Sequence, residues 1–160
     1  MFSAIHINHK VPGFKASSFF QSTIQDLQLS TYLGQWVVLF FYTSDFENDS
    51  KNEVMGFQDN YGEYQKLGVQ ILGCSTDSST IHEAWVKILS NVSFPLLSDS
   101  HHTMSIDYNV FDENKAQCLN GTFIIDAEQN LVWYQISGDQ TPRSQTEIIQ
   151  TIKNLQRIKS

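Results

Sequence analysis

Residues 36–42 of this chain, WVVLFFY, form an unbroken run of β-branched, aromatic and other apolar side chains. Such a run is typical of a strand that is buried on both faces, as in the middle of a parallel sheet. A polar loop, residues 43–49, follows it. Where a strand leads through a loop into a helix, the helix N-terminus offers unpaired N–H groups and the positive end of its dipole. We therefore expect functional residues near this loop, as in other α/β proteins.

A helix is predicted at the end of the loop. Ser50 and Glu53 have the S-x-x-E spacing of a capping box, which predicts that Ser50 is the N-cap of the helix. The acidic residues Glu47 and Asp49 would complement the helix dipole. Gly68 is well placed to end the helix. The apolar residues of this helix recur at helical spacing and are Val54, Phe57, Tyr61, Tyr64 and Leu67.

The rest of the sequence alternates between strand and helix patterns. Strands are predicted at 14–20, 24–29, 69–75, 94–97, 121–126 and 131–136, the last two as a hairpin. One helix opens at 78–80 with Ile81, Trp85 and Ile88 on one side, and one or two helical turns fall within 99–109. The last helix begins at Thr141–Pro142, and its core face is predicted to hold Ile148, Ile152, Leu155 and Ile158. This order predicts one α/β domain over residues 1–160, with a mixed central β-sheet flanked by helices.

Composition excludes several classes of protein. The net charge is −7, and the 10 Lys and Arg residues are scattered, which argues against nucleic acid or an anionic membrane as partner. We see no secretory signal and no apolar run of membrane-spanning length, so a cytoplasmic protein is expected. No cofactor is predicted. The four histidines considered as metal ligands lack Cys, Asp or Glu at a recognisable spacing and are His6, His9, His101 and His102.

The strings WVVLFFY, DF, KLGVQILGCSTDS, HEAWV, FPLLSD, DYNVF and GTFIID resemble the peroxiredoxins, and among them the alkyl hydroperoxide reductase/thiol-specific antioxidant branch. The likeness runs from about Lys10 to Ile158. It implies a thioredoxin-like fold. It also implies a homodimer that pairs edge to edge through strand 131–136, or a larger ring, because peroxiredoxins use that strand in this way.

The resemblance also locates a site, and every key residue of that site is different here. In peroxiredoxins the loop after the central strand carries Pro, Thr and the peroxidatic Cys, while an Arg arrives from the strand before the hairpin. In this chain the Pro position falls on Thr43, the Thr position on Glu47, the Cys position on Ser50 and the Arg position on Asn120. Arg143 matches a second Arg of the family and is expected to pair with Glu47 or another acid. No cysteine follows Cys118, so the family's C-terminal resolving Cys has no counterpart in this sequence.

These replacements oppose peroxidase chemistry. A serine hydroxyl does not supply a thiolate and cannot be oxidised to a sulfenic acid. The carboxylate of Glu47 would oppose the formation of a neighbouring anion, and Asn120 removes a cation. We therefore expect a protein with a degenerate peroxide site that acts by oligomerisation or by binding a partner, such as an active peroxiredoxin.

Three alternatives remain open from the sequence. Cys74 lies within an apolar strand and is expected to be inert, but two-residue alternation would place Cys118 and Asn120 on the same face, so Cys118 could be a displaced redox thiol. The former peroxide pocket could bind a small molecule instead. As a more distant alternative, Ser50 could be a nucleophile with Glu47 as its base.

Overall fold

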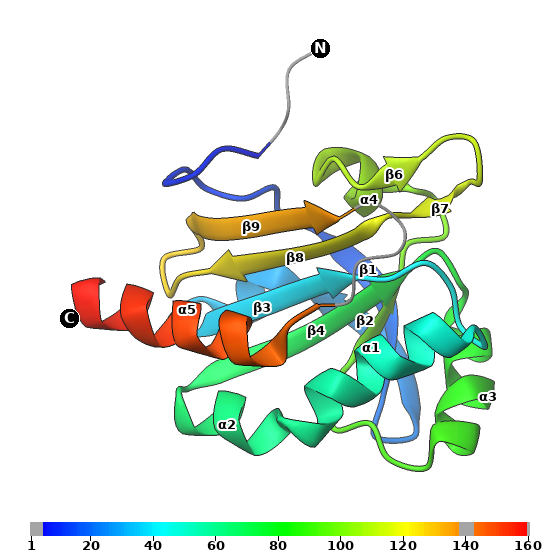
Figure 1. Cartoon of the computed structure of the whole chain (residues 1–160). Helices are drawn as coiled ribbons and strands as arrows, with labels where there is room; N and C mark the ends of the chain where they lie inside the picture. The colour runs from blue at the N-terminus through cyan, green and yellow to red at the C-terminus, as the bar shows by residue number, and fades with distance from the viewer. Residues whose placement is uncertain (1–4, 138–142, 160) are drawn as a thin grey trace.

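A seven-stranded mixed sheet forms the centre of the computed structural model, which describes residues 5–137 and 143–159 (Figure 1). The strand order across the sheet is β2-β1-β5-β4-β3-β8-β9. The bounds are β1 (Lys15–Phe20), β2 (Thr23–Gln28), β3 (Trp36–Phe41), β4 (Val69–Ser75), β5 (Leu96–Ser98), β8 (Asn120–Ile125) and β9 (Leu131–Ser137), with β6 (Phe111–Asp112) and β7 (Gln117–Cys118) forming a separate small hairpin.

Five α-helices and one 3₁₀ helix accompany the strands in the described part of the chain. They are η1 (Leu29–Tyr32), α1 (Asn48–Asp59), α2 (Tyr61–Lys66), α3 (Ser79–Leu89), α4 (Thr103–Asp107) and α5 (Gln145–Lys159). Strands β3, β4 and β5 run parallel, and β1 and β8 pair antiparallel on either side of them. The predicted mixed sheet flanked by helices is therefore confirmed.

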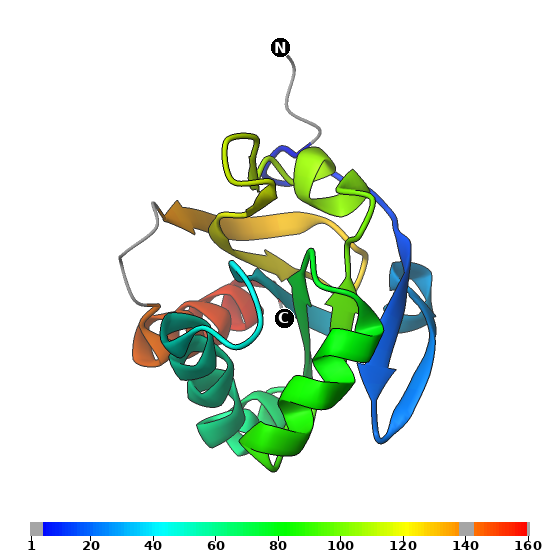
Figure 2. The ribbon, with the colours of Figure 1, turned by 90° about the vertical axis from the view of Figure 1, so that its right-hand side faces the viewer.

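Strand β3 supplies the core on both faces of the sheet, as its apolar sequence predicts. Val38 and Phe40 pack with the apolar faces of α1, α2, α3 and α5. Val37 and Leu39 point to the opposite face, which α4, η1 and the N-terminal segment cover. Figure 2 shows these two layers on either side of the sheet. The two-residue period of a strand thus divides one continuous apolar run between two cores.

An aromatic stack anchors α1 to β3. The rings of Phe40 and Phe57 lie parallel with their centroids 4.1 Å apart, and both side chains are fully buried. Gly73 of β4 leaves room for this stack, because a Cβ at that position would lie only 2.8 Å from the ring of Phe40 and 2.9 Å from Leu96. A side chain at residue 73 would therefore have to displace Phe40.

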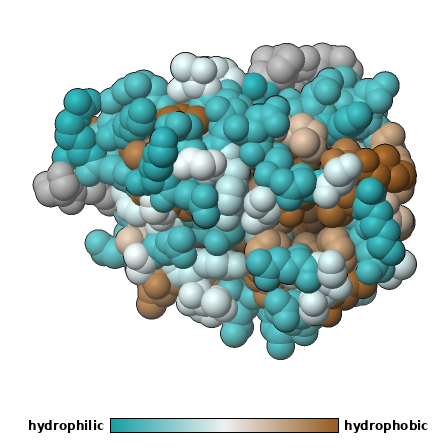
Figure 3. Space-filling view, turned by 90° about the horizontal axis from the view of Figure 1, so that it is seen from below, coloured by the Kyte–Doolittle hydropathy of each residue, from teal (hydrophilic) through white to brown (hydrophobic). Residues whose placement is uncertain are grey.

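Of the three apolar residues predicted on one side of α3, only Trp85 is buried. Ile81 and Ile88 are 41% and 68% exposed, and the buried residues of this helix are Ser79, His82, Trp85 and Leu89. The physical reason is His82, whose two ring nitrogens both have buried hydrogen-bond partners and which therefore turns its own side of the helix inward. Figure 3 shows the resulting concentration of hydrophobic side chains on the side of the molecule where α3 and the β1–β2 hairpin lie.

Two helix boundaries also differ from the sequence prediction. The first helix begins at Asn48 rather than Ser50, and a break at Asn60 divides it into α1 and α2. The predicted start of the last helix at Thr141–Pro142 lies outside the described residues, and α5 begins at Gln145. Ile158 does not face the core, because it is 77% exposed near the end of α5. In residues 5–137 and 143–159, no helix combines the length and the apolar character needed to cross a membrane.

Substitutions of buried and of exposed apolar helix residues should affect stability differently. Replacing Phe57 by Ala should lower the free energy of unfolding by about 3–5 kcal/mol, because the change removes a stacked, fully buried ring and leaves a cavity. The matched control, Ile88→Ala, should change it by less than about 0.5 kcal/mol, since that side chain is largely in solvent. Urea unfolding of the two variants measures both values. A cost for Ile88→Ala close to that for Phe57→Ala would contradict the burial assigned to α3.

Candidate functional site

The loop between β3 and α1 forms one wall of a small polar cavity. The cavity has a volume of about 70 Å³. Its lining comes from the β3–α1 loop, the first turn of α1, the β6–β7 turn with β7, and the start of β8, and consists of Thr43, Glu47, Asp49, Ser50, Lys115, Gln117 and Asn120. Thr43, Glu47, Ser50 and Asn120, which the sequence comparison predicts at the family's Pro, Thr, Cys and Arg positions, therefore lie around a single cavity.

Ser50 lies in the first turn of α1 and is only 2% exposed. Its hydroxyl lies 3.1 Å from Oγ1 of Thr43 and accepts a hydrogen bond from the backbone N–H of Ser44. The N-cap position is occupied by Glu47, so the prediction that Ser50 caps the helix was wrong. In the structure the hydroxyl instead ties the loop to the helix that follows it. Neither bonded group is a base that could activate the hydroxyl as a nucleophile.

The acidic residues of the loop lie at the rim of the cavity. Glu47 and Asp49 are exposed, and the Glu47 carboxylate accepts a hydrogen bond from the hydroxyl of Ser44 rather than from Ser50. Both carboxylates lie at the N-terminal end of α1, where the helix dipole favours negative charge. Their presence beside Ser50 makes the cavity a poor place to form another anion.

Arg143 lies behind the cavity and is held by a dense set of contacts. Its guanidinium forms a 3.0 Å ion pair with Glu53, and the two side chains are only 4% and 11% exposed. Nε donates to the hydroxyl of Thr122 at 2.8 Å, and Nη2 donates to the backbone carbonyls of Phe41 and Gly121. Burial lowers the pKa of Arg143, while the adjacent carboxylate of Glu53 raises it. The acid expected to pair with Arg143 is therefore Glu53 and not Glu47.

A buried polar network beneath the loop was missed by the sequence analysis. Nδ1 of His82 lies 2.6 Å from a carboxylate oxygen of Asp45, and the Tyr42 hydroxyl donates to the other oxygen at 2.7 Å. Nε2 of His82 donates to the backbone carbonyl of Leu97 at 2.8 Å. Burial, and next the charge of Asp45, raises the pKa of Tyr42. The strings DF and HEAWV, which carry the resemblance to the family, contain Asp45 and His82. Neither string reveals that the two side chains meet.

Cys118 does not lie in the cavity. It is 1% exposed and packs in the core on the α4 side of the sheet, with Met104 and Val110. Residues 117–118 and 120–125 are separate strands, so the two-residue alternation from Asn120 back to Cys118 is interrupted at Leu119. Burial raises the pKa of Cys118, with smaller contributions from the charges of two aspartates. Burial also raises the pKa of Cys74, which lies in the same core.

Three of the four histidines considered as metal ligands form ring contacts. His6 and His9 contact each other edge to face at 5.8 Å, while His102 stacks on Phe111 at 4.5 Å. Within the described ranges, no group of three or more His, Cys, Asp or Glu residues is arranged to hold a metal ion.

Both cysteines should resist thiol reagents in the folded protein. Because burial raises the pKa of Cys74 and Cys118, neither forms much thiolate at about pH 8, and neither sulfur is accessible. We expect almost no reaction with Ellman's reagent in buffer and rapid reaction of both thiols in urea. The variant Cys74→Ser isolates the second thiol. Fast reaction of native Cys118 in that variant would show that it is a reactive cysteine after all.

Comparison with known proteins places the chain in a family. The model of the AhpC/TSA family matches residues 7–134. A peroxiredoxin of Thermoplasma volcanium is 36% identical over 91% of this chain and 75% of its own length, and peroxiredoxin 2 of Drosophila melanogaster is 32% identical over 91% and 78%. The crystal structure of reduced 2-Cys peroxiredoxin from Plasmodium vivax superposes with a TM-score of 0.91 at 28% identity, over 94% of this chain and 82% of that one. This chain therefore belongs to the AhpC/TSA family of peroxiredoxins and has their thioredoxin-like fold.

Proposed function

We propose that this protein is a peroxiredoxin without the cysteine peroxidase activity of its family, and that it acts by binding. Its partners would be a second copy of the chain, a larger ring, or another protein such as an active peroxiredoxin. The observation that carries the proposal is the buried hydroxyl of Ser50, held against Thr43 at the start of α1, where the family's reaction requires a thiolate.

The surroundings of Ser50 support this reading. Thiol peroxidases form a bond between the attacking sulfur and one peroxide oxygen, which leaves a sulfenic acid that is later reduced. A serine oxygen cannot take this path. Asn120 is uncharged at the position of the family's Arg, and the guanidinium of Arg143 is already paired with Glu53. The rim carries the carboxylates of Glu47 and Asp49, which oppose the charge that develops during peroxide cleavage.

Two alternatives lose support from the geometry. A peroxidase that uses Cys118 would have to expose a thiol that is packed in the core and whose pKa is raised by burial. A binding module built on the former peroxide pocket would have to place its ligand in about 70 Å³, well below the roughly 300–1,000 Å³ of small-molecule sites.

Both cysteines are free thiols, which agrees with the reducing cytoplasm that we propose as the location.

The edge strand β9 is the surface that we propose for self-association. Tyr134 is 41% exposed on this strand, and Gln135 beside it is also exposed. A long edge strand with an apolar surface favours pairing with another strand, and two copies can pair symmetrically about a two-fold axis. The other edge of the sheet, β2, also exposes a large apolar residue, Ile24, which provides an internal comparison.

The peroxidase reaction gives the direct test. We expect no hydrogen peroxide consumption above background with excess dithiothreitol, and no added oxygen in the intact mass. The variant Ser50→Cys should recover little activity, because Glu47 and Asn120 still surround the new thiol. Cys118→Ser serves as the control for a displaced thiol. Robust turnover by the unmodified protein or by Ser50→Cys would overturn the proposal, and turnover that disappears in Cys118→Ser would assign the chemistry to that residue.

Self-association can be tested by comparing the two edges of the sheet. Tyr134→Lys places a charge on β9 and should shift the protein from dimer to monomer in sedimentation velocity. Ile24→Lys makes a similar change on β2 and should leave the dimer intact, since we propose no contact there. A monomeric unmodified protein, or equal effects of the two substitutions, would contradict pairing through β9.

A further inference from the structure

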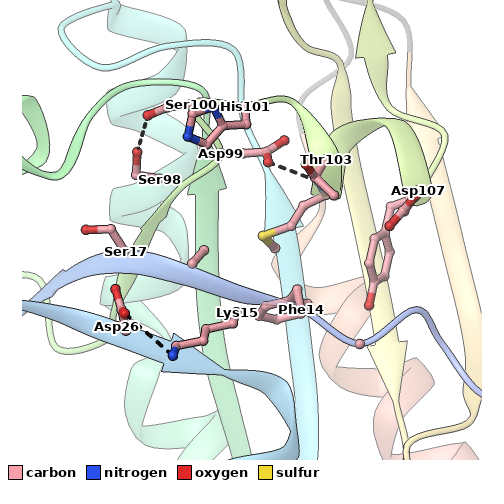
Figure 4. A pocket seen from close by; sticks show the side chains of 14 residues that line it. Phe14, Lys15, Ser17, Asp26, Ser98, Asp99, Ser100, His101, Thr103 and Asp107 are labelled. Carbon is pink, nitrogen blue, oxygen red and sulfur yellow. Dashed lines mark hydrogen bonds and ion pairs between the residues drawn. The ribbon is translucent and has the colours of Figure 1, made fainter.

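A second cavity lies away from the Ser50 site, between the start of β1, the end of β5 and helix α4 (Figure 4). Its volume is about 500 Å³, which falls within the range of sites that hold small molecules. It opens on the side of the sheet that α4 covers. Nothing in the proposed function uses this cavity.

The inner surface of the cavity is largely apolar. Phe14 and Ala16 provide its partly exposed apolar surface, and the ring of Phe14 rests edge to face on the ring of Tyr108 behind it, with centroids 6.4 Å apart. Tyr108 and Met104 are buried, and the Tyr108 hydroxyl is fixed by donation to the backbone carbonyl of Pro12 at 2.7 Å. The aromatic corner is therefore held in place before any ligand arrives.

The charged groups around this surface are mainly negative. Three aspartates line the cavity, against one lysine, Lys15. Asp99 is satisfied by the backbone N–H groups of α4, at 3.0 and 2.8 Å, and Asp26 lies 3.8 Å from the ammonium of Lys15 at the exposed mouth. Within residues 5–137 and 143–159, the carboxylate of Asp107 takes part in no hydrogen bond or ion pair.

Asp107 is half-buried and directly precedes Tyr108 in the chain. A half-buried carboxylate beside an aromatic corner attracts a cation more strongly than a carboxylate in water does, because the local dielectric is lower. The partly exposed ring of Phe14 adds a cation–π attraction. At the other end of the cavity, the hydroxyls of Ser17, Ser98 and Ser100 line the wall and retain the capacity to accept hydrogen bonds.

We propose that this cavity is a binding site for a small organic cation, with its ammonium group at Asp107, its apolar or aromatic body against Phe14 and Ala16, and any polar tail toward the serines. Anions of the same shape are disfavoured by the aspartates. The site is independent of the chemistry at Ser50, so it stands whether or not the protein reduces peroxide.

Three probes of matched shape test the charge preference. Tyramine, 4-ethylphenol and 4-hydroxyphenylacetate share a phenol ring and differ in carrying an ammonium, no charge or a carboxylate. In nitrogen–proton correlation spectra of the full chain, we expect tyramine to bind saturably with a Kd on the order of 1 mM. Its shifts should be confined to residues 13–17 and 98–108. The other two probes should bind roughly fivefold more weakly or worse.

Two variants test the role of the cavity's carboxylates. Asp107→Asn should weaken tyramine binding by roughly fivefold or more, and Asp26→Asn should weaken it less, by leaving Lys15 unpaired at the mouth. The control Asp59→Asn makes the same charge change on the exposed end of α1 and should have no effect. Equal binding of the three probes, shifts elsewhere on the protein, or unchanged affinity in Asp107→Asn would overturn the proposal. If Asp107→Asn does not fold, an unchanged affinity of Asp26→Asn for tyramine would also overturn the proposal.

Discussion

The ion pair between Arg143 and Glu53 holds together the elements that surround the family's active site. Glu53 belongs to α1, and the guanidinium also bonds to β3 and β8 through the backbone carbonyls of Phe41 and Gly121. Removing two charges from water is costly, and the cost is offset only when the geometry is good and the remaining N–H groups find acceptors. Both conditions are met here, because four donor–acceptor contacts surround one guanidinium. The position of α1 against the sheet depends on this arrangement.

The loop that carried the chemistry in the family is held by polar contacts that need no reactive residue. Below it, Asp45 and His82 join the loop to α3, and above it the hydroxyl of Ser50 bonds to Thr43. These contacts keep the loop and the first turn of α1 in position, with the hydroxyl of Ser50 at the position where we predict the family's thiol. The scaffold of a peroxiredoxin thus remains intact, since its stability comes from the sheet, the two cores and the buried polar groups rather than from the catalytic side chains.

The sequence was sufficient for those features that depend on local apolar pattern. Residues 36–42 identified the central strand, and the spacing of Val54, Phe57 and Tyr64 identified the helix that follows, because burial of one face leaves a periodic trace. The sequence was not sufficient where a buried polar side chain determined how a helix is oriented. His82 is polar by composition and was not counted as a core residue, yet its two buried hydrogen bonds set the rotation of α3. The four positions that we predict to match the family's active site were proposed only through resemblance, since no local pattern brings Asn120 to Ser50.

The stack of Phe40 on Phe57 has a consequence for how this fold can vary. The ring of Phe40 on β3 occupies the space that a side chain at residue 73 would need, and it stacks on the ring of Phe57 from α1. A change at any one of these three positions alters what the other two can accommodate, so their effects on stability will not add. In evolutionary terms the three residues form an epistatic unit. A lineage that enlarges Gly73 must also make room at Phe40 or Leu96, so packing limits the order in which such substitutions can occur.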